Sequence, residues 1–198
     1  MRVIFFIDQI STWTGKLFAW AILILTFVVS YEVFMRYVMG APTTWAYDTS
    51  YMLYGTLFMM SGAYALAHNA HVRADVVSRY FPTRVQAGLE LALYLVFFYP
   101  GILALLFYGW DFFAISYRQN EHSSYTPGGP PIWPYKFVIP ACAALLALQG
   151  LAEVSRCVLC LRHGKWPRRL GDVEEIAIPI NKEAEIKAAQ EQSKEPRQ

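Results

Sequence analysis

The sequence predicts an all-α integral membrane protein with four transmembrane helices, short interfacial amphipathic helices and both termini in the cytoplasm. Two observations give the fold class. Of the 198 residues, 56% are hydrophobic and only 16% are charged, a composition that is unusual for a soluble domain of this size. The hydrophobic residues also gather in four long runs with few charges. Four such helices in so short a chain would leave no amphipathic shell to cover them in water.

The N-terminal segment, residues 1–15, is expected to form an amphipathic helix in the cytoplasmic interface of the membrane. Asp8 interrupts its apolar character, and no small-residue cleavage site follows at the distance that a secretory signal peptide requires. The segment is therefore expected to be retained. Its apolar residues recur at helical spacing: Val3, Ile4, Ile7, Ile10 and Trp13.

The membrane domain is expected to cover residues 16–169. Crossing the hydrocarbon core takes about 20 apolar residues in a helix, and the second and third uncharged runs reach this length alone. The first and fourth reach it only with their flanks, to Met39 and Leu161, which include some charge. The four uncharged runs are residues 17–31, 49–67, 91–110 and 137–152.

Prolines and polar stretches mark the connections between the spans. Pro42 is expected to stop the first helix in a short turn, and residues 68–86 read as an interfacial helix ended by Pro82. Pro100 predicts a bend in the third span, because proline removes a backbone donor. The third connection, rich in proline and glycine, predicts an outward loop with extended pieces. Residues 170–198 are polar and predict a disordered cytoplasmic tail.

The distribution of bases predicts the orientation in the membrane. With the tail set aside, ten of the thirteen lysines and arginines lie at the N-terminus, in the second connection or in the C-terminal flank of the last helix. Cytoplasmic loops carry an excess of such bases. This rule places both termini and the second connection in the cytoplasm, and the first and third connections outside.

Charges at the ends of the first two spans are the first candidate site. Glu32 and Arg36 are four residues apart and share a helix face, and Asp48 follows across a short turn, from which it could reach the same neighbourhood. Charge in a span is costly unless it is paired or solvated. Two interpretations remain open here. One is an ion-paired clasp that fixes the first hairpin, and the other is a proton or ion site.

A second polar cluster follows the second span and contains His68, His71, Arg73 and Asp75. His71 and Arg73 could bind lipid phosphate or the acidic residues of a partner, or the four could be plain solvated loop residues. No helical HExxH site, phosphate-binding glycine loop or GxSxG elbow is present in the sequence. Cys157 and Cys160 form a CxxC pair, for which packing is favoured over a redox or metal role. The residues nominate no catalyst, and we expect no enzyme and no cofactor.

Three stretches resemble one family. "YEVFMRYVMGAPTTWAYD" carries Glu32, Arg36, Tyr37, Trp45 and Asp48, and looks like the first-hairpin signature of the small membrane subunit of tripartite ATP-independent periplasmic (TRAP) transporters. "GAYALAHNAHVRADVV" resembles the family's His-Val-Arg-x-Asp segment. "PIWPYKFVIPACAALLALQGLAE", with Trp133 and Pro134, resembles its last helix. Together they cover about residues 10–165. The chain departs at Asp48, where glutamate is more common, and in the length of the third connection.

The resemblance implies a scaffold role in the bacterial inner membrane. In that family, a soluble periplasmic binding protein captures an organic acid and delivers it to a membrane complex. A large elevator-type subunit binds the substrate and sodium, and the small subunit packs beside its stationary part. The resemblance therefore implies two partners, the large subunit and the binding protein, together with membrane lipids. Sodium is expected on the large subunit, so this chain needs no cofactor.

Two other classes of function compete with the scaffold. An independent small exporter would use Glu32 to exchange protons for a cationic drug, but such a carrier needs an unpaired acid near the membrane midplane. A membrane enzyme would need a nucleophile, a metal set or a haem histidine pair within the spans. The expected role of Glu32, Arg36 and Asp48 is to brace the outward hairpin, and Trp133 and Pro134 are expected to help dock a partner.

Overall fold

The computed structural model describes residues 2–68, 81–126, 128–164 and 166–167. Within these residues the fold is entirely helical, which confirms the predicted all-α class, and the β-type pairing is limited to an isolated bridge between His122 and Pro131. The elements are α1 (Arg2–Ala19), α2 (Ala21–Tyr37), α3 (Ala46–Ala67), α5 (Thr83–Leu93), a π-helical segment (Tyr94–Phe98), α6 (Tyr99–Gln119) and α7 (Trp133–His163).

Helices α1 and α2 form one helical stretch of 36 residues that is interrupted at Trp20. Helix α1 extends to Ala19, beyond the boundary at residue 15 that the sequence suggests. An interfacial helix would turn its polar side to water, but α1 turns Asp8 and Ser11 into the protein, where both are buried. Gly15 allows α1 to approach α3 closely, since a Cβ atom at this position would lie 2.5 Å from Cβ of Tyr64.

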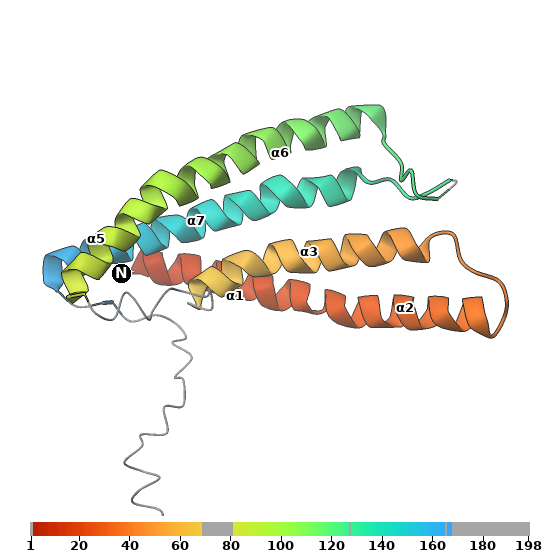
Figure 1. Cartoon of the computed structure of the whole chain (residues 1–198), viewed down its shortest axis with the longest axis horizontal. Helices are drawn as coiled ribbons and strands as arrows, with labels where there is room; N and C mark the ends of the chain where they lie inside the picture. The colour runs from red at the N-terminus through yellow and green to blue at the C-terminus, as the bar shows by residue number, and fades with distance from the viewer. Residues whose placement is uncertain (1, 69–80, 127, 165, 168–198) are drawn as a thin grey trace, which may run out of the picture.

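Helix α5, the π-helical segment and α6 form one continuous helical rod, which runs from Thr83 to Gln119. Its irregular turn lies directly before Pro100, where the sequence predicts a bend. The N–H of Tyr99 donates to the carbonyl of Tyr94, five residues back, and such widened turns accommodate local irregularities in a helix. Figure 1 shows that the rod is bowed along its length.

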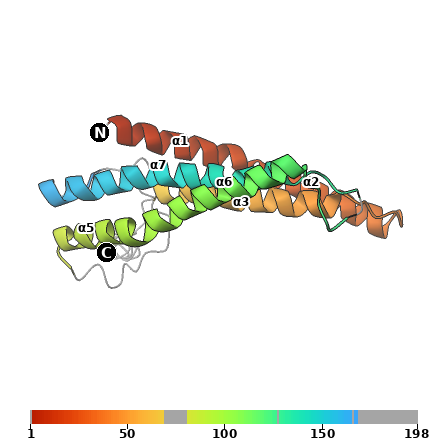
Figure 2. The same ribbon diagram turned by 90° about the horizontal axis from the view of Figure 1, so that it is seen from above.

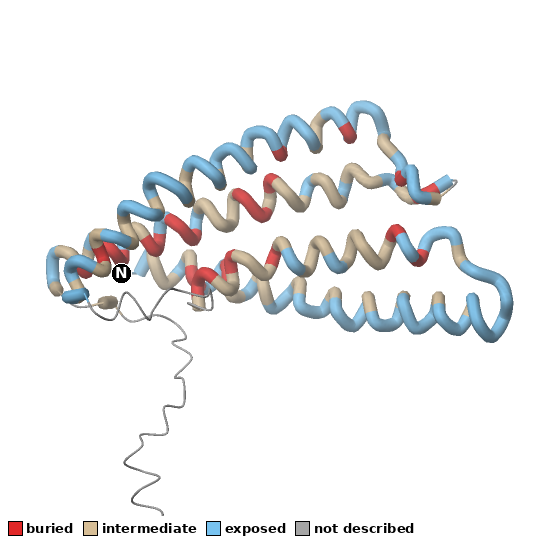
Figure 3. The backbone as a smooth tube through the Cα atoms, viewed as in Figure 1, coloured by how far each residue is buried: buried red, intermediate tan, exposed pale blue. Residues whose placement is uncertain are grey.

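The principal contacts between long helices run from α6 to α7, from α7 to α3, and from α3 to α2 and α1. Figure 1 shows the corresponding row, in which α6 and α2 lie at the two edges, and Figure 2 shows α1 leaving the row at one end. Helix α7 is the centre of the fold: 39% of its most apolar stretch is buried, against none of that of the α5–α6 rod. Buried residues accordingly follow α7 and the two ends of α3, whereas α2 has none (Figure 3).

Three helical stretches are long and apolar enough to cross a membrane: Arg2–Tyr37, Thr83–Gln119 and Trp133–His163. They contain the first, third and fourth spans that the sequence predicts. The second predicted span corresponds to α3, which has 22 residues but is not among these three. Tyrosine, threonine, serine and glycine are frequent in α3 and lower its hydropathy. By length and composition, the part of the chain that the structure describes therefore supports three of the four predicted spans.

Candidate structural and partner-interface site

Glu32 joins the end of α2 to the turn that follows it. One carboxylate oxygen accepts a hydrogen bond from Nε of Arg36 at 3.0 Å. The other accepts one from the backbone N–H of Thr43 at 3.0 Å and another from the Thr43 hydroxyl. Arg36 and Glu32 are thus in contact, as their spacing of four residues predicts. Both oxygens of Glu32 are engaged, and the carboxylate ties α2 to the chain segment that leads into α3.

Asp48 does not join this group. It lies in the first turn of α3, is fully buried, and accepts a hydrogen bond at 2.7 Å from the hydroxyl of Ser123 and another from Thr126. These two donors belong to the connection between α6 and α7, 75 and 78 residues further along the chain. The carboxylate therefore links the first hairpin to the second. The sequence suggested a meeting with Glu32 and Arg36, and the structure gives Asp48 other partners.

The α6–α7 connection is held by backbone pairs of its own. Ser123 N–H donates to Pro130 O at 3.0 Å, and Ile132 N–H donates to Glu121 O at 2.9 Å. The imidazole Nδ1 of His122 lies 2.8 Å from Gly129 O. These contacts fold the predicted outward loop back on itself. The Asp48 carboxylate thus binds a loop whose shape is largely set by the loop itself.

Aromatic rings surround the Asp48 contact. The ring of Tyr125 packs against Tyr47 and Tyr51, with centroids 5.9 and 5.7 Å apart, and Tyr51 also contacts Tyr135 of α7 at 5.9 Å. Such edge-on pairs add about 0.5–1.5 kcal/mol beyond the burial of their surfaces. The rings thus reinforce the link between the two hairpins.

The remaining predicted residues of this end are spread over its surface. Trp45 is exposed and stacks on Tyr31, with ring centroids 6.1 Å apart, and Tyr37 is 78% exposed. Trp133 is half-buried and packs on Tyr117 of α6 at 5.3 Å. Pro134, in the first turn of α7, is exposed.

Lys136 anchors the start of α7 to the end of α6. Its ammonium group pairs with Glu121 and lies 3.9 Å from the centroid of the Phe112 ring, a distance at which cation–π attraction operates. The hydrogen bond from Lys136 holds the pKa of the Glu121 carboxyl below its ordinary value. Glu121 is the second residue after α6, so this pair fastens the loop near its start.

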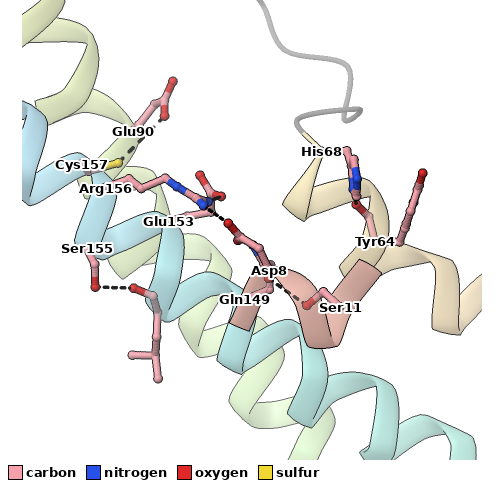
Figure 4. A network of polar contacts seen from close by, with 11 residues as sticks. Asp8, Ser11, Tyr64, His68, Glu90, Gln149, Glu153, Ser155, Arg156 and Cys157 are labelled. Carbon is pink, nitrogen blue, oxygen red and sulfur yellow. Dashed lines mark hydrogen bonds and ion pairs between the residues drawn. The ribbon is translucent and has the colours of Figure 1, made fainter. Parts of the chain in front are cut away.

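The opposite end of the bundle contains a buried polar cluster that the sequence analysis missed (Figure 4). Its members are Asp8 and Ser11 of α1 with Gln149, Glu153 and Arg156 of α7, all at most 1% exposed. The Arg156 guanidinium pairs with both carboxylates. The Gln149 amide donates to Asp8 at 2.9 Å, and Ser11 donates to Gln149 Oε1 at 2.8 Å.

The sequence analysis counted Arg156 among the bases of the C-terminal flank. The structure adds that its side chain is fully buried and pairs with Asp8 of α1. Its Nε atom has no hydrogen-bond partner among the described residues. One signal was available: residues 149, 153 and 156 are spaced by four and three, so they share one helix face.

The remaining candidate residues are the second polar cluster and the cysteines. His71, Arg73 and Asp75 lie outside the described residues. Cys142, Cys157 and Cys160 are buried, and the Cys157 thiol lies 3.9 Å from a carboxylate oxygen of Glu90. In the described parts of the chain, no three histidine, cysteine, aspartate or glutamate side chains are placed to hold a metal ion together.

The comparisons with known proteins give the family. The model of the DctQ component of tripartite ATP-independent periplasmic transporters matches residues 25–160, which is more than half of the chain. A comparison with curated proteins gives no match. The matched range contains the Glu32 and Asp48 contacts and most of the buried polar cluster. It also agrees with the long apolar helices of the fold, which indicate a membrane protein. The chain belongs to the DctQ family, the small membrane components of TRAP transporters, which is a family of transporter subunits and not of enzymes.

Proposed function

We propose that the chain is the scaffold subunit of a TRAP transporter that takes up organic acids with the energy of an ion gradient. The observation that supports this role is the row of helices with its uncovered faces. Helix α2 has no buried residue, and large apolar side chains are exposed along α2 and α6. A membrane protein of this shape offers its broad sides to lipid and to another membrane subunit. The large TRAP subunit is the partner that the family implies.

The proposed topology has four spans, both termini in the cytoplasm and a location in the bacterial inner membrane. Helix α3, at a rise of about 1.5 Å per residue, is roughly 33 Å long, which matches a hydrocarbon core of about 30 Å. It lies in the row beside α2 and α7. The two hairpin connections lie at one end of the row, and the N-terminus of α1 lies at the other (Figure 1). We also propose that α1 contacts lipid at the cytoplasmic interface and that residues 170–198 form a cytoplasmic tail.

The end with the two hairpins is proposed to face the periplasm and to help dock the soluble binding protein. The side chains of Glu32, Arg36 and Asp48 are engaged in hydrogen bonds within the chain, which supports a bracing role for these three residues. Pro134 and Tyr37 are exposed there and are proposed contacts for a partner. His71, Arg73 and Asp75 are proposed partner or lipid contacts on the cytoplasmic side. Sodium is proposed to bind the large subunit, so that no cofactor is needed here.

The alternative is an independent proton-coupled exporter that uses Glu32. The contacts of Glu32 favour the scaffold. Its carboxylate is bound by the Arg36 guanidinium and by both donors of Thr43, and an adjacent cation favours the charged form of an acid. A proton-exchanging acid needs to change its charge during each cycle, and these three donors oppose that change.

Affinity purification tests the scaffold role. The chain, tagged at its C-terminus, is purified from its native membrane in mild detergent, and the co-purifying proteins are identified by mass spectrometry. The expected result is a stoichiometric, much larger multi-span protein. The matched variant is Glu32→Gln, which keeps the shape of the side chain but removes its charge. If the chain instead purifies alone and transports a cationic drug in liposomes, with activity lost in Glu32→Gln, the exporter is correct and the scaffold role is wrong.

A further inference from the structure

Helix α6 has two opposite faces of different character. The face that packs on α7 contains the buried residues Gly109 and Ser116, and Gly109 allows close approach because a Cβ atom there would lie 2.8 Å from the Ile139 side chain. The opposite face, which we call the α6 outer face, is exposed at every position. At helical spacing, it consists of Gly101, Ala104, Tyr108, Asp111, Ile115 and Arg118.

The α6 outer face carries two charged side chains, Asp111 and, in the last turn of the helix, Arg118. Asp111 is exposed and forms no hydrogen bond or ion pair with any residue that the structure describes. It lies within the Thr83–Gln119 rod, which is long and apolar enough to cross a membrane. A carboxylate on a lipid-facing surface is unfavourable, and charged residues in membrane helices nearly always meet a partner or water. Glu32, Asp48 and Glu121 all have partners within the chain, so Asp111 differs from them.

The same face has the features of a helix-packing surface. A Cβ atom added at Gly101 would meet no described atom within 4 Å, so this glycine leaves open space, and Ala104 is one turn away. Small residues of this kind let two membrane helices approach closely, and polar side chains then hydrogen-bond between them. Tyr108, which is 76% exposed, and Asp111 supply such polar groups one and two turns from Ala104.

The geometry points to the α6 outer face as the surface that packs against a membrane helix of the large TRAP subunit, and assigns Asp111 to an ion pair with a lysine or arginine of that helix. This inference rests on the proposed scaffold role. Lipid acyl chains are an unsuitable occupant because they offer no donor to the carboxylate. A second copy of this chain, packed in the same orientation about a twofold axis, would bring Asp111 toward its own symmetry mate, and like charges repel. A helix of another protein that carries a lysine or arginine would donate to the Asp111 carboxylate and would avoid this repulsion.

Photocrosslinking from the intact complex tests this assignment. A photoreactive phenylalanine analogue is placed at Tyr108 or at Ile115, on the α6 outer face, and at Phe27 of α2, which is 75% exposed, as the comparison position. Crosslinks from Tyr108 and Ile115 to the large subunit are expected. Crosslinks only to lipid or to a second copy would overturn the assignment. If the large subunit co-purifies but crosslinks only from Phe27, the scaffold role stands and the choice of face is wrong.

Substitutions at Asp111 provide the second test. Asp111→Leu and Asp111→Lys are expected to reduce the amount of co-purified large subunit. For Asp111→Lys, the dissociation constant should rise by about thirtyfold or more, since losing one partner of a buried interfacial charge pair has effects of this size. The thermal midpoint of the chain purified alone should not fall, because Asp111 has no partner among the described residues. Ala104→Leu should also weaken assembly, whereas Ala19→Leu, at an exposed alanine of α1, should not. Unchanged assembly in Asp111→Lys and Ala104→Leu would contradict the inference.

Discussion

Arg156 of α7 forms an ion pair with Asp8 of α1, 148 positions earlier in the chain, and both side chains are completely buried. The same guanidinium pairs with Glu153, three residues before it. Removing a charged pair from water is expensive, and attraction between the partners offsets this cost only when the geometry is good and the other polar atoms are satisfied. Gln149 and Ser11 supply further hydrogen bonds to this group, and Nε of Arg156 is its one polar atom with no partner among the described residues. The position of α1 therefore depends on its polar face as well as on apolar packing.

Replacing Arg156 by glutamine is expected to destabilise the chain by about 3–5 kcal/mol, because it leaves buried carboxylates without their cation. Thermal unfolding in detergent measures the effect. The double variant Asp8→Asn with Arg156→Gln should recover part of the loss, and the double-mutant cycle gives the coupling between the two residues. Arg162→Gln is the matched control, since Arg162 is exposed in the last turn of the same helix. Equal effects of Arg156→Gln and Arg162→Gln would contradict the structural role.

Local patterns in the sequence predicted the helical class and the contacts between residues that are close together in the sequence. The all-helical class follows from the apolar runs, and the Glu32–Arg36 contact follows from a spacing of four residues. The Asp8–Arg156 and Asp48–Ser123 contacts join residues 148 and 75 positions apart. Such pairs depend on how helices are rotated and aligned against one another, and the period of a single helix does not specify this. Asp8 therefore reads as an interruption of an apolar segment until α7 is placed beside it.

The second span at residues 49–67 was predicted from uncharged length alone, and as a membrane span it stays a prediction. The structure has one helix there, α3, and this helix owes its low charge to tyrosine, threonine, serine and glycine as much as to aliphatic residues. Several of these residues have packing roles that only the tertiary structure reveals. Gly55 faces the Tyr135 ring, and Tyr64 faces Gly15. The polar character of α3 thus reflects its contacts with α1 and α7.

Gly15→Ala is expected to destabilise the chain by about 1–3 kcal/mol, because the added methyl group would overlap the Tyr64 side chain between α1 and α3. The conflict is with the Cβ atom of Tyr64, which a rotamer change does not move. Gly88→Ala is the control, since a Cβ atom there would meet no described atom within 4 Å beyond its own turn of helix, and alanine in a helix is favoured over glycine by up to about 1 kcal/mol. Thermal midpoints that move in opposite directions are expected. A Gly15→Ala variant as stable as the original chain would show that the helices are less closely packed.

Acid is expected to loosen the α6–α7 connection through Glu121. The hydrogen bond from Lys136 lowers the pKa of this carboxyl in the folded state. A group with a lowered folded pKa stabilises the fold at pH values above its unfolded pKa, about 4.3 for glutamate, and this contribution is lost as pH falls through the folded pKa. Thermal midpoints measured between pH 7 and pH 3 should therefore fall less steeply for Glu121→Gln than for the original chain. Parallel pH profiles for the two proteins would show that the pair contributes nothing to the acid response.

Asp48→Ala is expected to release the α6–α7 connection from the first hairpin. The hydroxyls of Ser123 and Thr126 would lose their common acceptor, and an unsatisfied buried polar group costs about 1–3 kcal/mol. Hydrogen exchange at the amides of Ser123 and Ile132, which are bonded within the loop, should become faster. Asp48→Asn should have a smaller effect, because its amide oxygen accepts from one hydroxyl and its amino group donates to the other.

Thr49→Val is the matched control for the Asp48 experiment. Thr49 follows Asp48 directly, but its hydroxyl donates within its own helix, to the Trp45 carbonyl at 3.0 Å. Its replacement should leave exchange in the connection unchanged. Because Asp48 is held by hydroxyl donors from the second hairpin, a loss of protection confined to the connection would show that this carboxylate couples the two hairpins. Equal exchange in Asp48→Ala and the original chain would mean that the loop keeps its position through its backbone pairs and the contacts of Tyr125 with Tyr47 and Tyr51.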